Sequence, residues 1–298
     1  MRRVLLLAGL VALGGASMVA SALQPSEAQT IDVVKVKENL YVLTSSTPGD
    51  PKTFSGGNVA VFITDAGVVL VDTKLAGWGQ TLLARIKSVT DKPVTTLINT
   101  HTHGDHTGNN ALFGATVDSV VHENTKANMT RMDAYKGENA KFLPKRTYTS
   151  TLSIGSGKDR VDLYHFGPGH TDGDTFVVFP ALRVMHTGDM FAWKDAPFLD
   201  RSNGGSGVQM PQTLAKVLAT VKDVDTIIPG HSPVTSRKDL EEFQRFTSDL
   251  LAATQAARKA GKTVDEASAS IDLSGKYPAY TSARVKAAVQ AIYDELTP

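Results

Sequence analysis

Short runs of apolar, β-branched residues alternate with helical patterns along most of the chain. Residues 59–63 and 68–71 are nearly continuous apolar runs joined by residues 64–67, which predicts a hairpin whose strands are covered on both faces. Helical spacing follows over residues 75–89, and a strand pattern returns over 94–99. Further strands are predicted at 116–121, 161–166, 175–179, 182–186 and 226–228.

Two amphipathic helices are predicted near the C-terminus. The first spans 236–260, starts with Ser236 and Asp239 at capping-box spacing, and stops at Gly261. The second spans 285–296. Each carries an apolar stripe that predicts core packing: Leu240, Phe243, Phe246 and Leu250 in the first helix, and Val285, Val289, Ile292 and Leu296 in the second.

After residue 28 the sequence contains neither a repeat nor a linker rich in Pro, Gly and Ser. We therefore expect one layered α/β domain over 29–298, with C-terminal helices from about residue 236. Long loops are expected at 45–58, 131–147 and 192–208, and loops of this length in a compact domain are usually functional.

The first 28 residues have the pattern of a bacterial export signal. Arg2 and Arg3 precede an apolar run over 4–13, and small residues then offer cleavage sites after Ala22 and Ala28. The arginine pair also loosely resembles a twin-arginine signal. The alternative is an uncleaved membrane anchor, but residues 14–17 interrupt the run before the roughly 20 apolar residues that a membrane span prefers. We expect a periplasmic or secreted protein with no stable membrane insertion after cleavage.

Composition narrows the chemistry further. The 298 residues include eight His and no Cys, which excludes disulfide scaffolds, thiolate nucleophiles and Cys-ligated metals. Any metal must therefore be held by His and carboxylate side chains. Because 31 Lys and Arg balance 30 Asp and Glu, nucleic acid is not an expected partner. We expect a small-molecule substrate, and the sequence pattern indicates no particular oligomeric state.

The segment from Thr100 to Asn109 concentrates the candidate chemistry, because His101, His103, Asp105 and His106 lie within six positions directly after a predicted strand. In an extended chain His101 and His103 point the same way, so both imidazoles can reach one ion. Gly104 then lets the backbone turn, and Asp105 and His106 open a helix at a different angle. One short segment can therefore provide ligands for two adjacent metal positions.

Three downstream residues could complete these two sites. His170, Asp189 and His231 each follow a predicted strand and a glycine-containing turn. The pattern therefore places all three on one rim of a sheet, where the active sites of α/β proteins tend to form.

The chain resembles the metallo-β-lactamase superfamily of metallohydrolases. The H-x-H-x-D-H motif at 101–106, the later His, Asp and His in the same order, and the strand Val69-Leu70-Val71-Asp72-Thr73 carry the resemblance, which covers roughly residues 55–235. It implies an α/β fold, the four-layered αβ/βα sandwich, with the site between two sheets.

The resemblance also implies a role for each matching residue. His101, His103 and His170 would bind a first metal, Asp105, His106 and His231 a second, and Asp189 would bridge them. Asp72 would accept a hydrogen bond that orients the metal-binding loop. Zinc suits these ligands best, giving two Zn²⁺ per chain, although iron or manganese would also be accepted.

The implied reaction is hydrolysis. Two divalent ions exceed the charge of the two bound aspartates by +2, which favours a bridging hydroxide that attacks a polarised carbonyl or phosphoryl centre. Asp105 is then the expected proton shuttle.

The resemblance only partly narrows the class of bond that we expect the protein to cleave. Asp189 stands where one lactamase subclass has Cys, and an Asp bridge resembles glyoxalase-II-like thioesterases, lactonases and phosphodiesterases. We expect cleavage of an ester, thioester, lactone or β-lactam-like amide. The alternative is a non-hydrolytic periplasmic metal-binding protein, or a redox or sulfur-pathway protein of the same fold.

Aromatic residues on the predicted loops are candidate substrate contacts, with ordinary packing as the alternative: Phe54, Phe191, Trp193 and Phe198. Lys194 and Arg201 are candidate contacts for a substrate carboxylate, or else solvated charges. The other histidines, His122, His165 and His186, are expected to be structural.

Overall fold

The structure is a computed structural model that describes residues 30–45 and 53–297, so the predicted export signal and part of the loop at 45–58 lie outside the described residues. The N-terminal part of the chain forms a seven-stranded sheet with the strand order β1 to β7. Its strands are β1 (Ile31–Lys37), β2 (Leu40–Ser45), β3 (Val59–Ile63), β4 (Val68–Val71), β5 (Val94–Ile98), β6 (Asp118–His122) and β7 (Arg146–Tyr148). It is antiparallel from β1 to β4 and parallel from β4 to β7.

A six-stranded sheet follows in the order β13-β12-β11-β10-β9-β8. Its strands are β8 (Thr151–Ile154), β9 (Val161–Tyr164), β10 (Phe176–Phe179), β11 (Val184–Gly188), β12 (Thr226–Pro229) and β13 (Thr235–Ser236). Only β11 and β12 pair in parallel in this sheet, and the other described pairs are antiparallel. The ends of β11 and β12 therefore point to the same rim.

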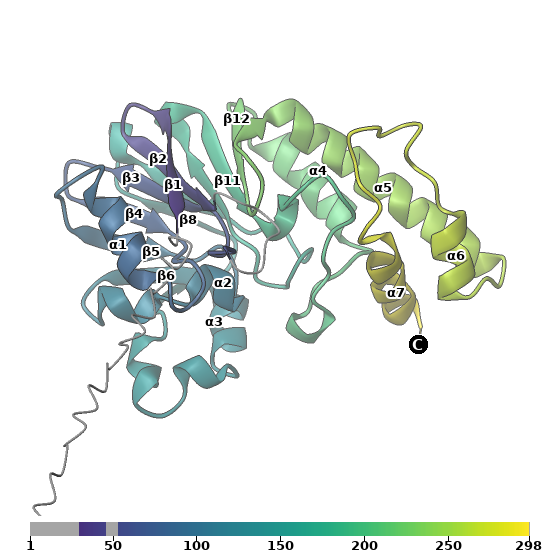
Figure 1. Cartoon of the computed structure of the whole chain (residues 1–298), viewed down its shortest axis with the longest axis horizontal. Coiled ribbons are helices and arrows are strands. Elements are labelled where there is room, and N and C mark those ends of the chain that lie inside the picture. The colour runs from purple at the N-terminus through teal and green to yellow at the C-terminus, as the bar shows by residue number, and fades with distance from the viewer. Residues whose placement is uncertain (1–29, 46–52, 298) are drawn as a thin grey trace, which may run out of the picture.

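Helices cover the outer faces of both sheets (Figure 1). The α-helices are α1 (Gly79–Lys87), α2 (Gly104–Thr107), α3 (Glu123–Met129), α4 (Met210–Thr220), α5 (Arg237–Lys259), α6 (Val264–Ser270) and α7 (Val285–Leu296). Short 3-10 turns occupy residues 110–113, 133–135, 137–142, 157–159, 180–182, 189–191 and 201–203. In Figure 1 the green and yellow helices α4 to α7 lie on one side of the molecule, and α1 lies on the other.

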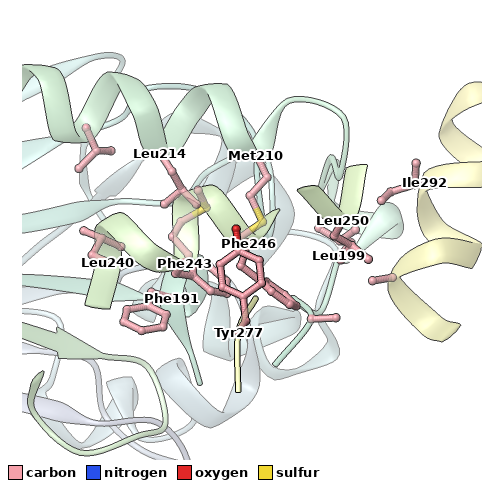
Figure 2. Close-up of a cluster of buried hydrophobic side chains, with 14 of the residues drawn as sticks. Phe191, Leu199, Met210, Leu214, Leu240, Phe243, Phe246, Leu250, Tyr277 and Ile292 are labelled. Carbon is pink, nitrogen blue, oxygen red and sulfur yellow. The ribbon is translucent and has the colours of Figure 1, made fainter. Parts of the chain in front are cut away.

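Three buried apolar clusters hold these layers together. One lies between the sheets, where Phe62 of β3 meets Phe179 of β10 edge-on with ring centroids 5.0 Å apart. A second joins α1 to the first sheet through Leu82 and Ile86. The third joins the second sheet to α4, α5 and α7 (Figure 2). The layer order helix, sheet, sheet, helix confirms the four-layered αβ/βα sandwich.

The two C-terminal helices match their predictions, whereas the helix predicted at 75–89 is shorter than expected. α1 begins only at Gly79, because Gly77, inside the expected range, has a positive φ of 92°, and Lys74, just before that range, has a left-handed φ of 65°. A right-handed helix cannot pass through such residues. The chain therefore makes a tight turn directly after β4.

No helix in the described ranges is long and apolar enough to span a membrane.

The start of α5 is held by a network around Asp239. The Asp239 carboxylate accepts hydrogen bonds from the backbone N–H and hydroxyl of Ser236, from Thr235, and from Lys194 Nζ at 2.5 Å. Burial alone would raise the pKa of Asp239, but these donors outweigh it and hold the pKa below its usual value of 3.8. The ionised carboxylate therefore stabilises the folded state.

We expect Asp239→Asn to lower the free energy of unfolding at pH 7 by about 1 kcal/mol, the usual scale of a helix cap. Because the folded pKa is depressed, the difference from wild type should be present above pH 4 and shrink as the pH falls below it. Urea unfolding at several pH values measures both effects. Asp223→Asn, at an exposed residue, is the matched control, and an equal loss in that variant would contradict the assignment.

Candidate metal centre

Two groups of potential metal ligands lie side by side at the rim between the sheets. The first contains His101, His103, His170 and Asp189, each with one ligand atom within 4.8 Å of the others. The second contains Asp105, His106 and His231, by the same measure. The structure thus brings together all seven residues that the sequence suggested.

Local backbone geometry explains the two groups. His103 is extended, with φ −62° and ψ 146°, and α2 begins at the next residue. His101 and His103 therefore face one group, whereas Asp105 and His106 lie in α2 and face the other. This is the arrangement expected from the spacing of the motif.

Asp189 lies between the groups. Its Oδ2 is 3.1 Å from His231 Nε2 and 3.7 Å from His170 Nε2, and its Oδ1 is 3.3 Å from His106 Nε2. Within the groups, His103 Nδ1 lies 3.0 Å from His170 Nε2, and His106 Nε2 lies 3.3 Å from His231 Nε2. Asp189 therefore occupies the position from which a carboxylate can reach both groups.

The outward nitrogens of four of these imidazoles have fixed partners. His106 Nδ1 donates to Asp72 at 2.7 Å, and His103 Nε2 donates to Asp200 at 2.7 Å. The remaining two, His170 and His101, bond through Nδ1 to Phe198 O at 2.7 Å and to Thr100 Oγ1 at 2.9 Å. Such bonds fix the ring orientation and leave the second nitrogen free to ligate.

Asp72 organises the whole segment after β5. Its fully buried carboxylate accepts from the backbone N–H and the hydroxyl of Thr100, each at 2.8 Å, in addition to His106. It therefore lies where the resemblance placed it. Asp200 has a comparable place beside His103, and its position far along the chain gave no sequence signal.

The donor set fits a cation. His101 Nε2 and Asp189 Oδ1 are buried and lack a hydrogen-bond partner among the described residues, which is costly unless another ligand satisfies them. Burial lowers the pKa of His101, and lowers that of His170 to about 4, so both rings are neutral at pH 7. Neutral imidazole is the form that binds metals.

Charge leads to the same conclusion. Burial by itself would lower the pKa of His106, but the carboxylates of Asp189, Asp105 and Asp72 raise it well above 6.5. Three carboxylates around one imidazole constitute a local surplus of negative charge, which divalent cations would neutralise.

Two glycines leave room for these side chains. A Cβ on Gly57 would lie 2.1 Å from His106 Cε1, and a Cβ on Gly230 would lie 1.9 Å from Asp189 Oδ1. Any larger residue at either position would displace a potential ligand.

A cavity of about 460 Å³ opens beside the two groups. Its described lining is Phe54, Gly56, Asn58, His103, Asp105, Asp189, Trp193, Phe198, His231, Ser232, Pro233 and Arg284. The predicted aromatic residues Phe54, Trp193 and Phe198 are therefore in its wall.

Phe191 does not line the cavity, which corrects its assignment as a substrate contact. The 3-10 turn at 189–191 directs its ring into the core, where it is 1% exposed and stacks on Phe243 of α5 at 4.7 Å (Figure 2).

The remaining candidate side chains also lie away from the cavity. Lys194 pairs with Asp239, and Arg201 bonds to Gly205 O. The three other histidines have structural partners: His122 bonds Thr149 O, His165 bonds Asp174 O, and His186 bonds Asn58 O.

Sequence reasoning missed two basic residues near the site. Lys74 is fully buried, and its Nζ lacks a hydrogen-bond partner among the described residues. Burial lowers its pKa to about 7, against the opposing effect of Asp105 and Asp72. Its position next to an apolar strand was a usable signal. Arg284 lines the cavity from the start of α7, and no motif marked it.

Known proteins resemble this chain in sequence and in fold. It is 27% identical to a metallo-beta-lactamase type 2 of Elizabethkingia meningoseptica over 245 residues, which cover 78% of this chain and 90% of the relative. It is 28% identical to the metallo-beta-lactamase IND-1 of Chryseobacterium indologenes, over 66% of this chain and 80% of that one. The solved metallo-beta-lactamase from Pontibacter korlensis superposes with a TM-score of 0.62 at 20% identity, covering 74% of this chain and 99% of the other.

The family model described as the metallo-beta-lactamase superfamily matches residues 53–231, a segment that contains all seven potential ligands and Asp72. This segment is more than half of the chain. The chain therefore belongs to the metallo-β-lactamase superfamily.

Proposed function

We propose that this protein is an exported, dinuclear zinc-dependent hydrolase that cleaves an ester, thioester, lactone or β-lactam-like amide bond. The observation that carries the proposal is the pair of adjacent ligand groups, with Asp189 within reach of both and two buried atoms that have no hydrogen-bond partner among the described residues. The relatives named as metallo-beta-lactamases support the hydrolase class. The signal-like residues 1–28 support a periplasmic or secreted location for the domain at 29–298.

The donor set determines which metals are suitable. Five imidazoles and two carboxylates suit zinc, and would also accept iron or manganese. Once bound, a pair of such ions lowers the pKa of water to about 7 and so supplies a hydroxide nucleophile at neutral pH.

The protein side chains position the substrate and move the proton. Phe54 and Trp193 flank His231, with ring centroids 5.6 Å and 5.4 Å from its ring, and form an apolar wall for the substrate body. Asp105 also lines the cavity, with Oδ2 3.4 Å from His231 Nε2. Its carboxylate can accept a proton from the nucleophile and donate it to the leaving group.

Metal analysis together with a substrate panel tests the proposal. We expect two zinc ions per chain and turnover of at least one class among β-lactam, lactone, thioester and phosphodiester substrates. Two zinc ions with no turnover of any class would instead support the alternative, a non-hydrolytic periplasmic metal-binding protein. A single iron with oxygen-dependent turnover would support the redox or sulfur-pathway alternative.

We expect Asp105→Asn to lower kcat by about 10²- to 10⁴-fold, because the amide cannot accept the proton. Metal content is measured on the same sample, since Asp105 is also a proposed ligand. Nearly full turnover with metal content intact would rule out the proton-shuttle role.

We expect Asp72→Asn to weaken metal binding by about 10- to 100-fold, because His106 and Thr100 lose their common carboxylate acceptor. Competition with a chromophoric chelator measures the affinity. Asp162→Asn is the control, because Asp162 is also buried but bonds Ser153 of β8 and Arg160, the residue just before β9, away from the potential ligands. Equal losses in the two variants would show a general effect of removing a buried carboxylate.

A further inference from the structure

Arg284 reaches the cavity from outside the segment that matches the family. It immediately precedes α7, more than fifty residues beyond the last potential ligand, His231. Its side chain nevertheless lines the cavity together with Asp105, Asp189 and His231. The C-terminal segment therefore provides part of the wall.

Buried Asp195 fixes this segment in place. The Asp195 carboxylate accepts a hydrogen bond from Thr281 Oγ1 at 2.6 Å and from the backbone N–H of Arg284 at 3.4 Å. The backbone N–H of Thr281 donates to Lys194 O at 3.0 Å. Residues 281–284 are thus tied to the loop that carries Trp193.

The guanidinium of Arg284 has an aromatic neighbour but no carboxylate partner among the described residues. Its Cζ lies 3.9 Å from the centroid of the Trp193 ring, a cation–π contact that restricts the side chain to one surface. It has no hydrogen bond or ion pair with any other side chain in the described ranges. Its N–H groups remain available for the two parallel hydrogen bonds that a carboxylate accepts.

The lining of the cavity indicates which kind of ligand can bind the Arg284 guanidinium. Among the described lining residues, Arg284 alone carries a fixed positive charge, and the same lining has four large apolar side chains, Phe54, Trp193, Phe198 and Pro233. A carboxylate has one negative charge, which one guanidinium neutralises. A phosphate carries up to two, and one guanidinium would leave the second without a fixed positive partner in this wall.

We propose that Arg284, stacked on Trp193, is the specificity-determining residue of this cavity, and that it binds a carboxylate on the part of the substrate remote from the scissile bond. This inference rests on the proposed hydrolytic function. It adds a substrate class, namely small molecules with an apolar body and one carboxylate.

The test uses paired compounds on the metal-loaded protein. For the substrate class that the panel identifies, a member with a remote carboxylate is compared with its neutral carboxamide. We expect Arg284→Gln to lower kcat/KM for the carboxylate at least tenfold, mainly through KM, and to leave the carboxamide unchanged. Arg284→Lys should recover part of the loss, because it restores the charge without the planar fork.

A binding measurement keeps the test independent of turnover. Phenylacetate, phenylacetamide and phenylphosphonate are titrated while tryptophan fluorescence is followed, with Trp193→Phe identifying the signal of the cavity. We expect Arg284→Gln to raise the Kd for phenylacetate about tenfold and to leave the Kd for phenylacetamide unchanged. Any contribution of the metals to anion binding is common to both proteins and cancels in this comparison.

Lys286→Gln is the matched control, because it removes an equal charge from the same segment at an exposed lysine that pairs with Asp265. Equal effects of both variants, or no effect of Arg284→Gln on any carboxylate, would overturn the inference even if hydrolysis is established. A larger loss for phenylphosphonate than for phenylacetate would overturn the carboxylate assignment. If no substrate is turned over, the proposed function fails, and the titrations still decide the role of Arg284.

Discussion

The buried carboxylate of Asp72 is the constraint on which the site depends. β4 and β5 are parallel neighbours, and the backbone N–H of Asp72 donates to Ile98 O at the end of β5. Its carboxylate accepts hydrogen bonds from Thr100, which directly precedes the H-x-H-x-D-H motif, and from His106, which ends it. Its left-handed φ of 66° is strain that these contacts maintain.

A second constraint links the two sheets. The Asn58 side chain donates to Pro229 O and Ser232 O, both at 2.8 Å, and its backbone N–H donates to Gly230 O at 2.7 Å. The segment before β3 is thereby attached to the turn that carries His231. The second group of potential metal ligands takes His106 from the first sheet's side and His231 from the second. These hydrogen bonds therefore help to fix the distance between His106 and His231.

The sequence allowed much of the fold to be predicted, and most of the missed strands share one physical cause. All eight strands predicted from apolar runs are present, and they occupy interior positions where both faces are covered, as in β4 and β11. The missed strands are β2 and the four edge strands β1, β7, β8 and β13. Edge strands are partly exposed, so polar residues interrupt their apolar pattern, as the sequence IDVVKVK of β1 illustrates.

The same distinction applies to the site. The seven donor residues lie in compact motifs at strand ends, and local pattern was enough to find them. Asp200 and Arg284 act through contacts made by distant segments, which no local pattern encodes. Phe191 was grouped with Trp193 because only one residue separates them in the sequence, which does not reveal that the 3-10 turn at 189–191 directs the Phe191 ring into the core.

The attachment of residues 281–284 to the Trp193 loop has an evolutionary consequence. The residues that could hold metal and the residue proposed to bind the substrate carboxylate belong to separate stretches of the chain, and contacts of Asp195, Trp193 and Lys194 join the second stretch to the loop after Asp189. Substitutions at the start of α7 would alter the far wall without moving any ligand. Selection can therefore change the substrate preference without changing the metal-binding residues. We expect relatives with the same metal-binding residues to differ in sequence first in this segment.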